Sequence, residues 1–175
     1  WITDVSGVEF NGRVFIEGPY ANGVMNTTLR DSSYLPLSHP FGGSPHNYDG
    51  TESVKSIPPG VVDWILVELR TQSESSSKAA SRVAFIKSDG MIVDLDCISQ
   101  VTFSGMNPAN YYVVVKHRNH IEIMSTNSIA LNSNSSSLYD FTTGSGQFYG
   151  IGGAQELEID VWGMWSGDIS QDGEV

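Results

Sequence analysis

The strongest strand signal in the chain is the ten-residue stretch Val61-Val62-Asp63-Trp64-Ile65-Leu66-Val67-Glu68-Leu69-Arg70. Aliphatic and β-branched residues dominate this stretch, and no glycine or proline interrupts it. Successive side chains of a strand point to opposite faces, so the odd-numbered residues from Ile65 to Leu69 share one apolar face. The even-numbered residues from Trp64 to Glu68 share the other face, which we expect to be half apolar and half solvated.

Further strands are predicted where short β-rich runs lie between clusters of Gly, Pro, Asn and Ser. Ser88-Asp89-Gly90 joins two such runs as a hairpin turn, since glycine accepts the positive φ that these turns require. Helical periodicity is scarce, so the sequence predicts an all-β protein: an antiparallel β-sandwich of Ig-like, prealbumin-like or jelly-roll type. The other predicted strands are Val8–Glu17, Arg82–Lys87, Met91–Cys97, Val101–Phe103, Tyr111–His117, Ile121–Met124, Ile129–Leu131 and Leu157–Val161.

Two segments depart from the strand pattern. A short helix is predicted near Met25–Asp31, with Asn26 or Thr27 as its cap. A long irregular loop, roughly Tyr34 to Pro59, is rich in Pro, Gly, Ser and aromatic residues. The aromatic content of this loop favours an ordered, packed segment, and we expect Trp64 to lie in the core or beneath it.

Charge and composition exclude several classes of partner. The 175 residues include 20 acidic and 9 basic ones, for a net charge of −11. Clustered Lys and Arg are needed to bind nucleic acids or anionic membranes, so we expect neither partner. No apolar run approaches the roughly 20 residues of a membrane span. The lone Cys97 has no internal disulfide partner, and the alternation across Met91–Cys97 predicts that it is buried.

The chain ends in a pattern of alternating oxygen ligands: Gly167-Asp168-Ile169-Ser170-Gln171-Asp172-Gly173-Glu174-Val175. Asp168, Ser170 and Asp172 fit positions one, three and five of an EF-hand-like loop, and Gly173 fits the sharp turn at position six. The sequence therefore predicts a β-sandwich module over 1–166 and the start of a calcium loop over 167–175. The acidic ligand at position twelve would follow Val175, so we expect only a half-site and read the chain as part of a longer protein. Any targeting segment would then lie outside it.

This terminal loop resembles a dockerin-type calcium repeat, the connector of secreted bacterial polysaccharide-degrading and surface proteins. The body is similar to an uncharacterised module of large secreted Bacteroidetes-type proteins. The segments that carry this resemblance are Arg13–Tyr20, Asp63–Arg70, Tyr111–His120 and Gly163–Asp168. The resemblance implies an extracellular location, an accessory role beside other domains of a parent chain, and calcium as a structural cofactor. It implies no catalytic residues.

Aromatic residues in Gly-, Pro- and Asn-rich segments are the most suggestive feature of the body. The apolar face of a sugar ring stacks on exposed aromatic rings, while polar side chains bind its hydroxyls. Burial of these rings at the ends of the sandwich is the alternative. The residues predicted to bind a ligand are Tyr20, Tyr34, Phe41, His46, Tyr48, Tyr149 and Trp165.

Three functions fit these observations. The first is a non-catalytic carbohydrate-binding module that binds polysaccharide by aromatic stacking and polar contacts. The second is a structural or adhesion module with no glycan ligand, and the third is a small enzyme, although no catalytic motif supports it. His117 and His120 point to opposite faces if the chain is extended there, whereas a turn at Arg118-Asn119 would bring them together. A cleft that holds clustered histidines would favour the enzyme.

Overall fold

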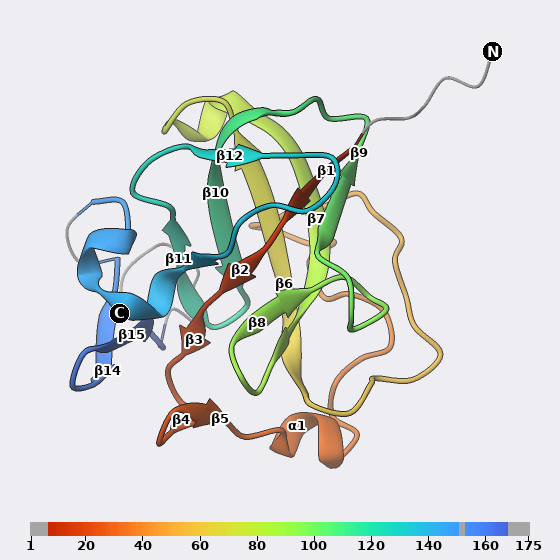
Figure 1. The fold of residues 1–175 in the computed structure, drawn as a ribbon. Helices are drawn as coiled ribbons and strands as arrows, with labels where there is room; N and C mark the ends of the chain where they lie inside the picture. The colour runs from red at the N-terminus through yellow and green to blue at the C-terminus, as the bar shows by residue number, and fades with distance from the viewer. Residues whose placement is uncertain (1–6, 151–152, 168–175) are drawn as a thin grey trace.

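The stretch Val61–Arg70 forms one continuous strand, β6 (Val61–Arg70), and all ten of its residues are buried. This is the arrangement in a computed structural model that describes residues 7–150 and 153–167. β6 pairs antiparallel with β7 (Lys78–Lys87) on one side and with β10 (Ala109–His117) on the other. It therefore forms the centre of the main sheet, and the prediction of an all-β, sandwich-like fold is confirmed (Figure 1).

The main sheet has the order β11-β10-β6-β7-β8-β2-β13, and β12 also pairs with β10. Smaller sheets β14-β15-β3, β1-β9 and β4-β5 complete the fold. Two pairings, β13 with β2 and β15 with β3, are parallel, and the other strand pairs are antiparallel. The remaining strands are β1 (Gly7–Phe10), β2 (Gly12–Arg13), β3 (Phe15–Ile16), β4 (Tyr20–Ala21), β5 (Val24–Met25), β8 (Met91–Val93), β9 (Val101–Ser104), β11 (His120–Met124), β12 (Ile129–Leu131), β13 (Tyr139–Asp140), β14 (Gln155–Glu158) and β15 (Val161–Met164).

The predicted strand Val8–Glu17 is three short strands, β1, β2 and β3, each in a different sheet. Gly12 permits this path, because a Cβ atom on Gly12 would lie only 2.2 Å from the ring of Phe10. The segment thus crosses from sheet to sheet along the sandwich. At its end, Ile16 and Glu17 reach the cavity described below.

Three other boundaries were predicted wrongly. The strand over Met91–Cys97 ends at Val93, because Asp94 and Asp96 accept hydrogen bonds from the following backbone and form turns. Cys97 consequently lies half-buried in a turn with φ of 62°. The predicted strand Leu157–Val161 is divided, because Leu157 and Glu158 end β14, residues 159–160 form a turn, and Val161 begins β15. The helix α1 (Thr28–Asp31) is one turn long, and β5 occupies the beginning of the predicted span.

The two faces of β6 lie in different apolar clusters. Ile65, Val67 and Leu69 belong to the main core between the sheets, as their spacing predicts. Trp64 and Leu66 belong to a second cluster that also contains Leu35 and Phe41 from the long loop. The second face is not half solvated as expected, because the loop covers it.

The long loop over 34–59 forms no helix and no strand longer than an isolated bridge between Ser38 and Ser53. Its orange-to-yellow trace runs past β6 and β7 in Figure 1. Trp64 is fully buried beneath it, and its indole N–H donates to the carbonyl oxygen of Pro36 at 2.9 Å. The predicted ordered, packed loop is present, and its function in the fold is to cover one face of the sheet.

Candidate functional site

The seven residues predicted to bind a ligand lie in several different environments. Phe41 is completely buried, whereas Tyr34 is 75% exposed and Tyr149 is 48% exposed. The other four are half-buried: Tyr20, His46, Tyr48 and Trp165.

Most of these half-buried side chains have partners within the protein. Tyr20 donates its hydroxyl to Glu158 at 2.7 Å, and Trp165 donates its indole N–H to the carbonyl oxygen of Ala154 at 2.9 Å. Tyr48 donates to Glu52 at 2.6 Å, and burial together with this carboxylate raises the pKa of Tyr48. Among the described residues, none of the seven lines the large cavity described next.

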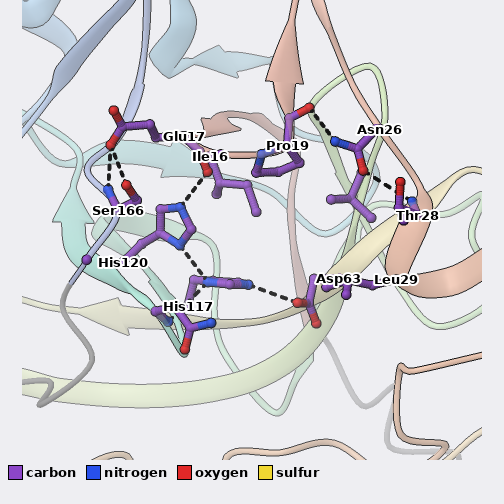
Figure 2. Close-up of a pocket in the computed structure, with 14 residues that line it drawn as sticks. Ile16, Glu17, Pro19, Asn26, Thr28, Leu29, Asp63, His117, His120 and Ser166 are labelled. Atoms are coloured by element: carbon purple, nitrogen blue, oxygen red, sulfur yellow. Dashed lines mark hydrogen bonds and ion pairs between the residues drawn. The ribbon is translucent and has the colours of Figure 1, made fainter. Parts of the chain in front are cut away.

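A cavity of about 790 Å³ opens where the β10–β11 turn meets α1 and the end of β3. Figure 2 shows its lining residues, which come from five separate parts of the chain. They are Ile16, Glu17, Gly18 and Pro19 at the end of β3 and just after it; Asn26, Thr28 and Leu29 at α1; Val62 and Asp63 on β6; His117, Asn119 and His120 at the β10–β11 turn; and Ser166 and Gly167 after β15.

Asp63 is the buried carboxylate beneath this cavity. It is only 2% exposed and accepts hydrogen bonds from Arg118 at 2.9 and 2.6 Å and from His117 Nε2 at 3.2 Å. Burial alone would raise the pKa of Asp63, but His117 and Arg118 outweigh this effect and lower it. Asp63 is therefore ionised, and the Arg118 guanidinium compensates its charge.

His117 and His120 are joined by the turn at Arg118-Asn119, and the second of the two predicted arrangements is the one observed. Their Nδ1 atoms are 2.8 Å apart, and both rings are buried. His120 Nε2 lies 2.9 Å from the backbone carbonyl oxygen of Glu17. A chain of contacts thus runs from Asp63 through His117 and His120 to the end of β3, as the dashed lines of Figure 2 show.

The ends of this series of contacts fix the direction of two hydrogen bonds. A carboxylate and a carbonyl only accept, so His117 Nε2 donates to Asp63 and His120 Nε2 donates to the carbonyl oxygen of Glu17. Burial lowers the pKa of His120 to about 4, so His120 is a neutral ring. Each ring nitrogen has a partner within the protein, and neither ring presents a free nitrogen to the cavity.

Glu17 stands at the rim of the cavity and fixes the chain after β15. Its Oε2 accepts hydrogen bonds from the backbone N–H of Ser166 at 2.8 Å and from the Ser166 hydroxyl at 2.7 Å. These hydrogen bonds lower the pKa of Glu17. The wall formed by Ser166 and Gly167 is held further by the donation from Gly167 N–H to the Asn119 carbonyl at 3.1 Å.

A second charge cluster, around the buried carboxylate of Glu68, lies toward the other end of β6. Glu68 accepts from Arg70 at 2.6 Å and lies 3.2 Å from Lys116. Glu122 closes the ring, at 3.4 Å from Arg70 and 3.2 Å from Lys116. Its two acids and two bases balance, and none of these four residues lines the large cavity.

The predicted calcium ligands Asp168, Ser170 and Asp172 lie outside the described residues. Within 7–150 and 153–167, no group of three or more His, Cys, Asp or Glu side chains is arranged to hold a metal ion. No helix in that part of the chain is long and apolar enough to cross a bilayer.

Sequence reasoning missed the cavity, although its signals were visible. Asp63 is an acid near the start of a mostly apolar strand, and the segment His117-Arg118-Asn119-His120 places three basic or titratable side chains at one turn. Comparison of the chain with protein-family models, curated proteins and solved structures finds no match.

Proposed function

We propose that this chain is a non-catalytic carbohydrate-binding module and that the cavity at the β10–β11 turn is its saccharide site. The observation that supports this proposal is the cavity itself, whose volume of about 790 Å³ lies within the usual range of small-ligand sites. The binding mode differs from the one predicted from sequence, because the cavity would enclose a sugar unit or chain end rather than offer an open aromatic platform.

The composition of the walls suits a saccharide. Ile16, Pro19, Leu29 and Val62 give apolar surface that can contact the C–H face of a sugar ring. Asn119 adds an amide that can both donate to and accept from hydroxyls. The backbone N–H of Asn119 donates to His117 Nδ1, but no described residue forms a hydrogen bond with its side-chain amide, which remains available to a ligand.

The extracellular location, the other domains of a parent chain and a structural calcium at Asp168, Ser170 and Asp172 are part of the same proposal. They rest on the resemblance of the sequence to secreted bacterial modules. The acidic surface, with a net charge of −11, fits a module that works among neutral polymers rather than nucleic acids.

One observation favours the alternative of a structural or adhesion module. The long loop, which carries four of the predicted contact residues, covers β6, and Phe41 lies fully within that cluster. If the module is only a spacer, its aromatic residues serve packing, and the cavity has no glycan ligand.

A panel of immobilised polysaccharides, with and without calcium, separates the two. We expect retention on at least one glycan, and weaker retention for Leu29→Ser, which removes apolar surface from the cavity wall. Leu37→Ser is the matched control, because Leu37 is exposed to a similar degree (49% against 44%) and does not line the cavity. Absence of retention on every glycan would contradict the proposal. An equal loss of retention in Leu29→Ser and Leu37→Ser would show that the binding site is not the cavity.

A further inference from the structure

The charges around the cavity are unequally compensated. Four lining residues carry or can carry charge, namely Glu17, Asp63, His117 and His120. The Asp63 carboxylate is bound by Arg118 and His117, and His120 is neutral for the reasons given above. Glu17 is different, because no described lysine or arginine forms an ion pair with it.

The Glu17 carboxylate is held in place by neutral donors. Both hydrogen bonds from Ser166 end on Oε2, and no described residue donates a hydrogen bond to Oε1. Two neutral donors fix the orientation of the carboxylate without cancelling its negative charge. The rim of a largely apolar cavity therefore bears one uncompensated, fixed negative charge.

We propose that Glu17 makes the cavity selective for a saccharide that bears a free, protonated amine. This inference rests on the proposed function, since it concerns the ligand of the same site. An ammonium group placed near Oε1 gains a charge-assisted hydrogen bond and charge pairing with Glu17. A neutral sugar gains a hydroxyl hydrogen bond only, and a uronic acid or sulfated sugar is repelled.

The net charge of the protein acts in the same direction over longer distances. With 20 acidic and 9 basic residues, the surface raises the local concentration of cationic oligosaccharides and lowers that of anionic ones. This long-range effect involves the whole surface and is screened by salt, whereas the contact with Glu17 is local. A single substitution that removes the charge of Glu17 can therefore separate the two contributions.

Glu17→Gln provides that separation. A glutamine oxygen can keep both hydrogen bonds from Ser166, and the amide nitrogen takes the position of Oε1, so the charge changes while the contact with Ser166 is retained. Asp49→Asn is the matched control, since it removes one negative charge from an exposed position outside the cavity. The probes are glucosamine, N-acetylglucosamine and glucuronic acid oligosaccharides of equal length, measured by calorimetry at pH 5.5 in low and physiological salt.

We expect the wild-type chain to bind the glucosamine oligomer most tightly and the glucuronic acid oligomer most weakly. Glu17→Gln should weaken glucosamine binding by up to about fivefold, as expected for a partly exposed ion pair, and should leave N-acetylglucosamine binding nearly unchanged. Asp49→Asn should preserve the wild-type order.

Three results overturn the inference. Equal binding of all three oligomers by the wild type would refute the selectivity while leaving the carbohydrate site in place. Loss of glucosamine binding in Asp49→Asn as large as in Glu17→Gln would assign the preference to net charge. Absence of binding to any of the oligomers, with binding of lysine-bearing peptides instead, would reject both the amino sugar and the glycan function.

Discussion

Two charge clusters are each centred on a buried carboxylate of β6, and they differ in what surrounds them. The Glu68 cluster comprises Glu68, Arg70, Lys116 and Glu122, which neutralise one another through four contacts of 2.6–3.4 Å. The Asp63 cluster comprises Asp63, His117, Arg118 and His120, and three of its members line the cavity. Both clusters place ionic groups in the sheet, yet only one of them opens to a ligand-sized space.

The difference teaches that a buried charge alone does not identify a site. A closed ring of two acids and two bases satisfies its own members and adds shape and register to the sheet. The Asp63 cluster instead fixes the positions of side chains that form a cavity wall, because His117 and His120 connect β6 to the end of β3. Stability should depend on both clusters, and ligand binding on one.

The largest expected effect is on stability, and it comes from breaking either cluster. Glu68→Gln removes the buried carboxylate that pairs with Arg70 and Lys116, and Asp63→Asn removes the buried carboxylate that pairs with Arg118 and contacts His117. Each should lower the free energy of unfolding by about 3–5 kcal/mol, as seen when one member of a buried ion pair is removed. Urea denaturation followed by tryptophan fluorescence measures both changes.

Binding of the preferred glycan should separate the same two variants. Under conditions in which both are folded, Asp63→Asn should lose affinity, because the His117 and His120 rings that line the cavity lose their anchor. Glu68→Gln should bind like the wild type. If the two variants lose affinity equally, the clusters are not functionally distinct, and the cavity is not the site.

The sequence predicted the two faces of β6 correctly but not the surroundings of its charged residues, and the reason is physical. Alternation along β6 correctly assigned Ile65 and Trp64 to opposite faces, since strand periodicity is local. The solvation of Glu68 was predicted wrongly, because its burial depends on distant segments that alternation does not encode. The cavity was missed for the same reason: Glu17 and Ser166 are 149 residues apart in the chain, and their contact arises only from the fold.

A smaller loss of stability is expected when the pH is lowered, and it arises from His120 in the Asp63 cluster. Burial lowers the pKa of His120 from 6.5 to about 4, so the unfolded chain binds more protons than the folded one between these values. Stability should therefore be fully present above pH 6.5 and should fall as the pH drops toward 4, by on the order of 3 kcal/mol. Protonation of His120 would place a buried cationic ring against His117, at an Nδ1–Nδ1 distance of 2.8 Å.

Urea midpoints between pH 4 and 7 measure this dependence, with His120→Asn as the comparison. The variant lacks the titrating ring, so its midpoint should change less over that range. Asp63 and Glu17, whose pKa values are also lowered, add a loss of the same sign at lower pH, so the window above pH 4 is the informative one. Identical pH dependence in the wild type and the variant would contradict a neutral, buried His120.

The smallest expected effect concerns Tyr34, the most exposed of the aromatic residues that the sequence associated with sugar binding. Tyr34→Ala should change the free energy of unfolding by no more than about 0.5 kcal/mol, because the side chain is 75% exposed. It should also leave glycan affinity unchanged, since Tyr34 does not line the cavity. Tyr149→Ala is a useful companion, because Tyr149 is partly exposed and packs edge-on against Tyr112. Loss of affinity in Tyr34→Ala, with the affinity of Leu29→Ser unchanged, would mean that the binding site is the aromatic long loop. The Asp63 cluster would then have a purely structural role, like the Glu68 cluster.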